Sequence, residues 1–345
     1  MFVSSSYLAG SLVQPVLQMQ TSLAQTVQEA STGEYADLGI QLGAQSGYEV
    51  SLRNQTGLLQ GLTSSNALVA VGLGTTQNAL ASIQSAAQSA LQNLAAASTA
   101  GQGQSIGTSS LQSLIAATNT TSAGQYVFGG INTASAPMQD YFAAGGSSAK
   151  AAIDQAFQTN FGFAPTDPAA SSITASAMQS FLSGPFAAQF QGSAWQTGWS
   201  SASNNNAVAE IAPGQFAQVS ANANNQGFQN LTEGYAMLSE FGGAPFSASV
   251  QQTVASSATS LIGAGISQMT AMQATLGTVQ QKVTDANSAM SSQLGILQTE
   301  VGSLDNVDPA ATSVKINELT SQLQTAYELT SRLHSLSLAQ YLPTT

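Results

Sequence analysis

The one histidine of the 345-residue chain, His334, is the side chain best suited to proton transfer near neutral pH. It lies between Leu333 and Ser335, in a segment with a helical pattern. A catalytic or metal-ligating histidine needs a second group that orients it, and the sequence offers no candidate for that role. We therefore interpret His334 as a residue on a helix face, in preference to a general base or a metal ligand.

Two aspartates and a glycine-rich run are the other candidates for chemistry. Asp305 and Asp308 could hold a hard cation together, but the EF-hand spacing and its bidentate glutamate are absent, so helix capping explains them better. The run Gly101–Gly107 does not match the dinucleotide-binding fingerprint, and it follows a helix instead of a strand. The chain has no cysteine, which excludes disulfides and thiolate metal sites. The sequence thus predicts no catalytic residue, no cofactor and no metal.

Trp195 and Trp199 are four residues apart and could form a stacking platform for a glycan. They belong to a segment, 131–246, that holds eleven of the 13 Phe and six of the 9 Pro. Aromatic side chains supply large buried areas, so a core private to this segment is the favoured interpretation. Helical and strand-like patterns alternate in it, which predicts a small α+β domain. Helices are expected at 148–159, 170–190 and 228–240, and strands at 195–200 and 207–220.

Long heptad patterns flank this segment on both sides. Apolar residues recur at spacings of three and four over 46–100 and again over 250–304. Such repeats predict long, coiled-coil-like helices, each with an apolar stripe that it must bury. If the two helices bury their stripes on one another, the sequence between them is an insertion. The residues expected to pack this helical rod are Leu59, Leu62, Val69, Leu73, Leu80, Ile83, Leu276, Val283, Leu297 and Leu304.

Both chain ends carry amphipathic patterns as well. An N-terminal helix is expected at 11–32, with Pro15 near its start, and a C-terminal helix that is capped by Asp308 and runs to about Tyr341. The apolar band of the C-terminal helix widens toward its end, and a helix that is apolar all round is normally buried. Contact between subunits would bury it. The residues expected to make that contact are Val13, Val16, Leu17, Leu23, Val27, Leu319, Leu323, Leu333, Leu336, Leu338 and Leu342.

The predicted fold class is mainly α: an elongated rod of long coiled-coil-like helices built from both chain ends, with an inserted small α+β outer domain. Five regions follow from this prediction. They are an N-terminal assembly helix, the N-terminal half of the rod, the outer domain, the C-terminal half of the rod and a C-terminal assembly helix. Their expected ranges are 1–40, 41–130, 131–246, 247–306 and 307–345.

Charge is scarce and unbalanced, because 5 Lys+Arg and 16 Asp+Glu give a net charge of −11. Nucleic-acid binding needs clustered basic residues, so nucleic acid is excluded as a partner. No stretch approaches the roughly 20 apolar residues of a membrane span. The N-terminus, Met1–Ser5, lacks the positive region of a cleavable signal peptide. If the protein leaves the cell, we expect a route that reads no such signal.

Three short stretches carry a resemblance to a known family. Gln28–Gly33 is similar to the segment of the flagellin superfamily where the first helix ends, and the helical ends around a folded, cysteine-free middle also resemble that superfamily. Gly124–Gly130 looks like the Tyr-x-Phe-Gly-Gly motif of one branch, the hook–filament junction proteins, which are the third hook-associated proteins. The ending Leu336–Leu342 resembles the C-terminus of that branch more than that of a filament flagellin.

The resemblance implies a non-enzymatic structural subunit of the bacterial flagellum, located outside the cell and exported by the flagellar type III apparatus. It implies a ring of identical subunits that joins the hook, through the first hook-associated protein, to the flagellin filament. A flagellar export chaperone is a further implied partner. Residues 1–40 and 307–345 would form an inner layer that folds on assembly. The two halves of the rod would form a middle layer around it, and 131–246 would be the exposed outer domain.

Two alternatives stay open. Filament flagellin, which has the same fold, is the first. Deletion distinguishes the two, because loss of a junction protein should leave hooks intact while unattached flagellin is released into the medium. A secreted adhesin or glycan-binding protein is the more remote alternative, and it depends on the tryptophan pair. For the assembly role itself, replacing Leu333 and Leu336 with Asp should leave the rod folded and abolish assembly.

Overall fold

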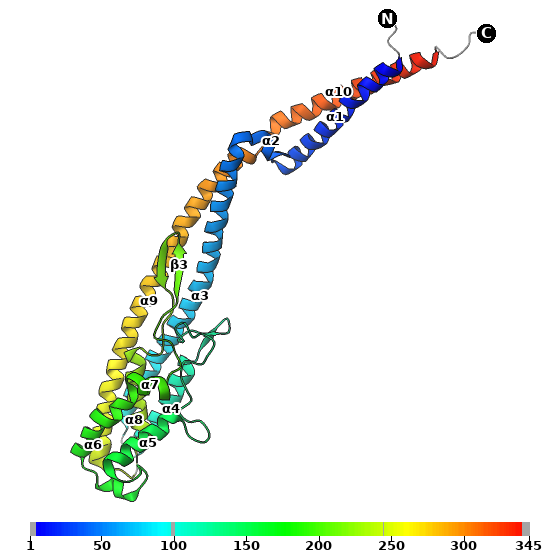
Figure 1. Cartoon of the computed structure of the whole chain (residues 1–345). Helices are drawn as coiled ribbons and strands as arrows, with labels where there is room; N and C mark the ends of the chain where they lie inside the picture. Colours follow the sequence, from blue (N-terminus) through cyan, green and yellow to red (C-terminus); the bar gives the residue numbers. More distant parts are fainter. Residues whose placement is uncertain (1–4, 98–100, 244, 340–345) are drawn as a thin grey trace. The chain divides into compact units, whose positions relative to one another are not determined.

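The computed structural model of the chain describes residues 5–97, 101–243 and 245–339, with side chains from residue 13 to residue 332 within these ranges. The described chain is mainly helical, and its long helices come from both ends of the sequence (Figure 1), which confirms the predicted fold class. The chain divides into two compact units. The terminal unit combines residues up to 60 with residues from 291 onward, and the central unit comprises residues 61–290.

Two helices pack along each other in the terminal unit, α1 (Ser5–Thr32) and α10 (Pro309–Ala339). α1 begins earlier than residue 11, so Pro15 lies inside it and removes one backbone donor there. α10 begins where the sequence predicts, because Asp308 Oδ1 accepts a hydrogen bond from the backbone N–H of Ala310 at 2.8 Å. The short elements between α1 and the next long helix are α2 (Leu38–Leu42) and η1 (Gly43–Gln45).

The two longest elements are α3 (Ser46–Ala96) and α9 (Ala248–Asp305), which the heptad patterns predict. Within the central unit they are antiparallel. The side-chain amide of Gln77 donates to the backbone carbonyl of Gln273 at 2.8 Å, and that of Gln84 donates to the Thr270 hydroxyl at 2.9 Å. Among the expected packing residues, Leu59, Leu73, Leu80, Ile83, Leu276, Val283 and Leu297 are buried, and Leu62, Val69 and Leu304 are half-buried.

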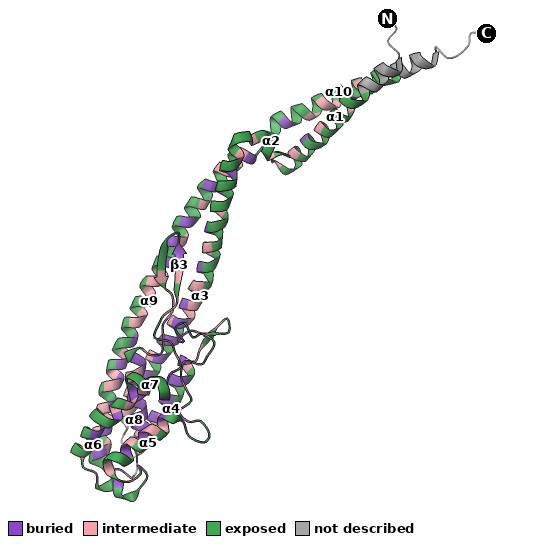
Figure 2. Cartoon of the chain, viewed as in Figure 1, coloured by how far each residue is buried: buried purple, intermediate pink, exposed green. Residues whose placement is uncertain are grey.

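Helix α8 (Gln226–Phe241) is the most deeply buried helix of the central unit, as Figure 2 shows. Helix α4 (Gln102–Thr118) packs against it at close range. The approach depends on Gly107, because a Cβ atom there would lie 2.4 Å from the Ser239 backbone nitrogen. The sequence predicted a helix at 228–240, where α8 lies, but it predicted no helix directly after the glycine-rich run that begins at Gly101.

The inserted segment differs from its prediction in two places. The single helix expected at 170–190 is instead a series of four short helical elements, and Pro185, which cannot donate a backbone hydrogen bond, lies in the third of them. The strand expected at 195–200 is wrong, because Trp195 begins the last turn of a helix. A spacing of four residues places two side chains on one side of either a helix or a strand, so the tryptophans could not decide between them. The helical elements here are α5 (Ser148–Phe161), η2 (Pro168–Ser172), α6 (Ala175–Phe181), η3 (Leu182–Phe186), η4 (Ala187–Phe190) and α7 (Gly192–Gly198).

The strands form two antiparallel hairpins in the central unit. Strands β1 (Thr121–Ser122) and β2 (Gln125–Tyr126) make a minimal hairpin outside the expected insertion. Strands β3 (Val208–Ala212) and β4 (Gln215–Gln218) lie within the strand-like piece predicted at 207–220, with an irregularity in register between Glu210 and Ala212. None of the helices in the described part of the chain is long and apolar enough to cross a membrane.

Candidate functional site

The helix pair α1/α10 leaves apolar side chains uncovered. Val13 is 54% exposed, Leu17 is 55% exposed and Val27 is 48% exposed. Three large apolar residues of α10 are exposed as well, on more than one side of that helix: Val314, Tyr327 and Leu329. These six residues are called the terminal apolar surface below. Transfer of apolar side chains of this size out of water lowers the free energy, so these residues are suited to contact with another protein.

The other residues predicted to contact a neighbouring subunit differ in their burial, and the structure describes the side chains of only some of them. Val16, Leu23 and Leu319 are half-buried, and Leu323 is buried in the terminal unit. A shallow groove of about 460 Å³ lies between the two helices, and its apolar walls include Leu23, Val27 and Leu323. Leu333, Leu336 and Leu338 lie in α10 with side chains outside the described residues, and so does His334. Leu342 lies outside the described residues altogether.

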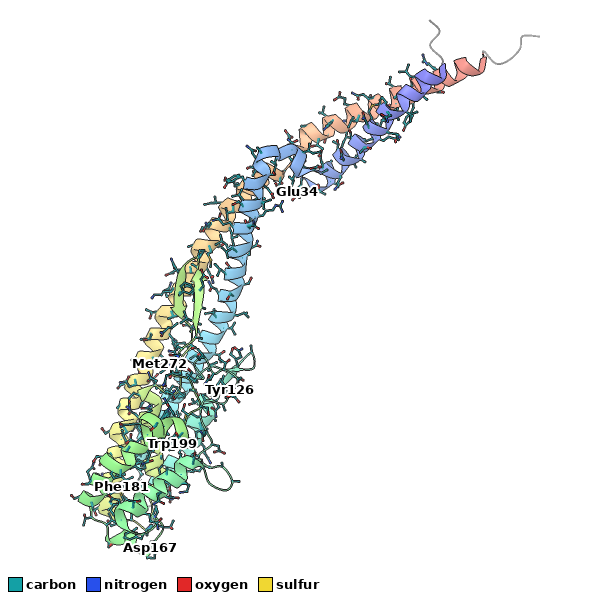
Figure 3. The ribbon with its side chains drawn as sticks, in the orientation of Figure 1. Glu34, Tyr126, Asp167, Phe181, Trp199 and Met272 are labelled. Carbon is teal, nitrogen blue, oxygen red and sulfur yellow. The ribbon has the colours of Figure 1, made fainter. Side chains whose placement is uncertain are left out.

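A short bridge joins the end of α1 to the end of α9. The backbone N–H of Tyr35 donates to the Asp305 carbonyl at 2.9 Å, and the N–H of Val307 donates to the Gly33 carbonyl at 2.9 Å. Between them, Glu34, which Figure 3 labels, pairs with Asn306 as an isolated antiparallel bridge. Gly33 has φ of +80°, a conformation that glycine adopts at little cost. This pairing fixes where the chain leaves α1 and enters α10.

An ion-pair cluster stands beside the bridge. Arg53 on α3 pairs with Glu49, one turn earlier, and with Asp305 at the end of α9. The hydrogen bond to Glu49, followed by that to Asp305, raises the pKa of Arg53 above its usual value. Both carboxylates are buried, and Asp305 Oδ1 has no hydrogen-bond partner among the described residues. The cluster therefore depends on a single guanidinium to compensate two buried negative charges.

Asp305 and Asp308 have separate structural roles, since the first pairs with Arg53 and the second caps α10. Within residues 5–97, 101–243 and 245–339, no group of three histidine or acidic side chains could hold a metal ion. Gly101 of the glycine-rich run caps α4 in a left-handed conformation. Each sequence candidate for chemistry that the structure describes thus has a structural role.

Trp195 and Trp199 are each only 1% exposed, so they cannot present a stacking platform to a glycan in this structure. The indole N–H of Trp195 donates to Asn224 Oδ1 at 2.9 Å. The Trp199 ring, labelled in Figure 3, stacks on Tyr141 with ring centroids 4.9 Å apart. The interpretation of the pair as part of a private core is the one that their burial supports.

Burial shifts the pKa values of titratable groups in the central unit. Burial, with the neighbouring charge of Glu240 as a second cause, raises the pKa of Tyr141, whose hydroxyl donates to Glu240 Oε1 at 2.8 Å. Lys150 donates to the other oxygen of Glu240 at 2.9 Å. Burial also raises the pKa of Glu233 on α8 to about 7. These groups belong to the packed interior and not to an open cavity.

Comparison with known proteins finds that both terminal regions of the chain are similar to bacterial flagellins. Residues 3–133 match the sequence profile of the bacterial flagellin N-terminal helical region, and residues 259–342 match that of the bacterial flagellin C-terminal helical region. A protein described as a flagellar hook-associated protein from Vibrio parahaemolyticus has a similar fold, with a TM-score of 0.50 and 13% sequence identity. The similarity covers 76% of this chain and 97% of that one. No curated protein sequence matched.

The two flagellin matches together span more than half of the chain. They include both helices of the terminal apolar surface, all of α3 and most of α9. The chain therefore belongs to the flagellin family, the structural proteins of the bacterial flagellum.

Proposed function

We propose that this flagellar protein is the hook–filament junction subunit. In this role identical copies form a ring that joins the hook, through the first hook-associated protein, to the flagellin filament. The observation that carries an assembly role is the terminal apolar surface, because a folded chain that stays alone gains nothing from six exposed apolar side chains on one helix pair. The subunit works by packing, without catalysis.

The junction role, as distinct from the filament, rests on the resemblance of Gly124–Gly130 to the motif of that branch. In this structure Phe128 of the motif is fully buried and meets Phe228 edge to face at 5.1 Å. Gly130 has φ of +64°, and a Cβ atom there would lie 2.5 Å from the Asn205 carbonyl oxygen. The motif is thus a packing centre at the start of the inserted segment, and this placement supports a role as the base of an outer domain.

The proposal also assigns the regions of the chain to layers. Residues 1–40 and 307–345 form the inner layer, 41–130 and 247–306 the middle layer, and 131–246 the exposed outer domain. The protein reaches this position outside the cell through the flagellar export apparatus, with a chaperone that binds it before export. Filament flagellin is the alternative role.

Location and deletion distinguish the two roles. Immuno-electron microscopy should place the protein in one narrow band between hook and filament, and label along the whole filament would refute the junction role. Deletion of the gene should leave intact hooks and release unattached flagellin into the medium. Hooks that still carry full filaments would contradict the proposal.

The assembly surface can be tested with charge substitutions on α1. The double variant Val13→Asp/Leu17→Asp should abolish incorporation into flagella, because each exposed apolar side chain becomes a charge that the interface would have to bury. The matched control is Gln14→Asp/Gln18→Asp, which adds the same charge at exposed polar positions of the same turns. Both variants should retain the tryptophan fluorescence of the central unit. Equal incorporation of the two variants would show that another surface drives assembly.

A further inference from the structure

Asn66 interrupts the apolar stripe of α3. Every seventh residue of this stripe is a leucine at Leu59, Leu73 and Leu80, and these side chains are at most 1% exposed. Asn66 occupies the same register position and is 0% exposed. A polar side chain in such a position lowers stability and is best explained by a specific partner that fixes the position of another element.

The side chain of Asn66 connects three elements of the central unit. Its Nδ2 donates to the backbone carbonyl of Ile211 in the β3–β4 hairpin at 2.7 Å. The same amide nitrogen donates to Asn287 Oδ1 on α9 at 2.8 Å. Its own Oδ1 is buried and has no hydrogen-bond partner in the part of the chain that the structure describes. The amide thus uses both hydrogens to hold its neighbours, and it leaves an unsatisfied acceptor that a leucine would not have.

The carbonyl of Ile211 is free to accept the hydrogen bond from Asn66 because the pairing of β3 with β4 is irregular at Ile211. Glu210 pairs with Phe216 and Ala212 pairs with Gln215, so Ile211 is the extra residue between two regular pairs. A bulged residue of this kind stays outside the ladder, and its buried carbonyl needs another donor. Asn66 is that donor. Sequence position and backbone irregularity therefore point to the same contact.

The β3–β4 hairpin buries few apolar side chains of its own. Its inner side buries Ile211 and Ala212, whereas Val208 and Phe216 on the outer side are 58% and 67% exposed. A two-stranded hairpin is only marginally stable by itself in water, so contacts with neighbouring elements decide its position. Phe216 and Ala217 of β4 also form one side of a groove of about 680 Å³, and Met272 and Leu276 of α9 form the other. The position of the hairpin therefore sets the width of that groove.

We propose that Asn66 is the clamp of the β3–β4 hairpin and that the hairpin is a strap able to leave α3 and α9 without unfolding them. A leucine in place of Asn66 would continue the apolar stripe of α3, but it would leave the Ile211 carbonyl without this donor. Loss of the clamp frees the hairpin and widens the groove beside α9. The inference concerns the isolated subunit and holds for either flagellar role.

Hydrogen exchange of the full-length protein tests the clamp. In the variant Asn66→Leu, amides of residues 208–218 should exchange at least about tenfold faster, whereas amides of α8 should keep their protection. The thermal midpoint does not test the clamp, because the substitution removes the unsatisfied Oδ1 of Asn66 but also takes the donor away from the Ile211 carbonyl and from Asn287 Oδ1. The matched control is Thr76→Val: Thr76 is also buried in α3, but within the described part of the chain its hydroxyl donates to the Gly72 carbonyl of its own helix and not to the hairpin. This control should leave exchange of the hairpin unchanged.

Unchanged exchange of residues 208–218 in a folded Asn66→Leu protein would overturn the proposal, and so would equal acceleration in the Thr76→Val control. If Asn66→Leu does not fold, the wild-type protein supplies the test. Under low denaturant, the hairpin amides should open with a smaller denaturant dependence than the amides of α9 in the central unit. Identical opening free energies and identical denaturant dependence in the two segments would show that the hairpin is not a separate strap.

Discussion

Replacement of Arg53 by glutamine would leave two buried carboxylates, Glu49 and Asp305, without their common ion-pair partner. Breaking a buried ion pair costs about 3–5 kcal/mol, and breaking an exposed one costs about 0.2–1 kcal/mol. The side chains of Glu49 and Asp305 are 7% and 3% exposed, but that of Arg53 is 52% exposed, so water already screens part of the attraction. We expect an intermediate loss of about 2 kcal/mol in local stability, or roughly thirtyfold in the opening equilibrium.

The bridge beside the cluster provides the assay. The amides of Tyr35 and Val307 donate to carbonyls across this bridge, and Asp305 belongs to both the bridge and the ion-pair cluster. In Arg53→Gln these two amides should exchange roughly thirtyfold faster, while the amides of α8 in the central unit stay protected. Arg53→Lys should restore only part of the protection, because a single ammonium does not reproduce the planar fork that spans two carboxylates.

A second substitution separates charge from packing. Adding Asp305→Asn to Arg53→Gln removes one of the two uncompensated charges, so protection of Tyr35 and Val307 should partly return. If it does not return, the loss in the single variant comes from the aliphatic part of Arg53. A change below roughly threefold in the single variant would refute the reasoning, because it would mean that solvent screening removes nearly all of the ion-pair energy.

Three further substitutions test the interior and one exposed helical position. Because burial raises the pKa of Glu233 to about 7, its carboxyl contributes most at low pH and loses that contribution as the pH rises through 7. The free energy of unfolding should therefore fall by up to about 3 kcal/mol between pH 5 and pH 8 in the wild type, and much less in Glu233→Gln, as measured by urea titration at each pH. Gly107→Ala should destabilise by about 1–3 kcal/mol, because the new Cβ would lie 2.6 Å from Leu238 Cβ; an unchanged urea midpoint would contradict this. Gly61→Ala should instead stabilise by about 0.5–1 kcal/mol, since a Cβ there meets nothing within 4 Å, and a lowered thermal midpoint would refute it.

The long helices were predictable because their signals are local and repeated. The heptad series identified Leu73, Leu80 and Val283, which are buried, and the pair Asp308–Pro309 marked the start of α10. The extent of α1 was less clear, because the stripe that begins at Val13 does not show that the helix starts at Ser5. Repetition therefore gave the type of these elements more reliably than their ends.

The contacts of the central unit and the Arg53–Asp305 ion pair of the terminal unit could not be predicted, because their partners lie far apart in the sequence. Nothing near Gly107 shows that α4 approaches α8 closely enough to require a glycine. Asn66 stood out only as a polar member of an apolar series, with no sign that its partner would be a carbonyl 145 residues away. Asp305, one partner of Arg53, lies 252 residues away from it. The chain has 16 Asp+Glu, and the sequence does not show which two of these carboxylates pair with Arg53.

For the terminal helices, the sequence predicted an apolar stripe but not which side of it faces the partner helix. Val13 and Leu17 stay exposed, whereas Leu323, a member of the same predicted set, is buried in the terminal unit. The exposed Val314 and Tyr327 were outside that set. An apolar band wider than one contact can serve two partners at once, and only the structure shows how the residues divide between them.

The pairing of α1 with α10 has a consequence for the order in which the chain can fold. Gln20 and Tyr327, which hydrogen-bond across this pair, are 307 residues apart. The entropic cost of closing a loop grows by only about 0.6 kcal/mol for each doubling of its length, but no contact can form before both segments exist. The central unit, which lacks this requirement, is free to fold first and to shorten the loop. Docking of α10 would then follow, so that α1 acquires this partner only after residues 309–339 have been made.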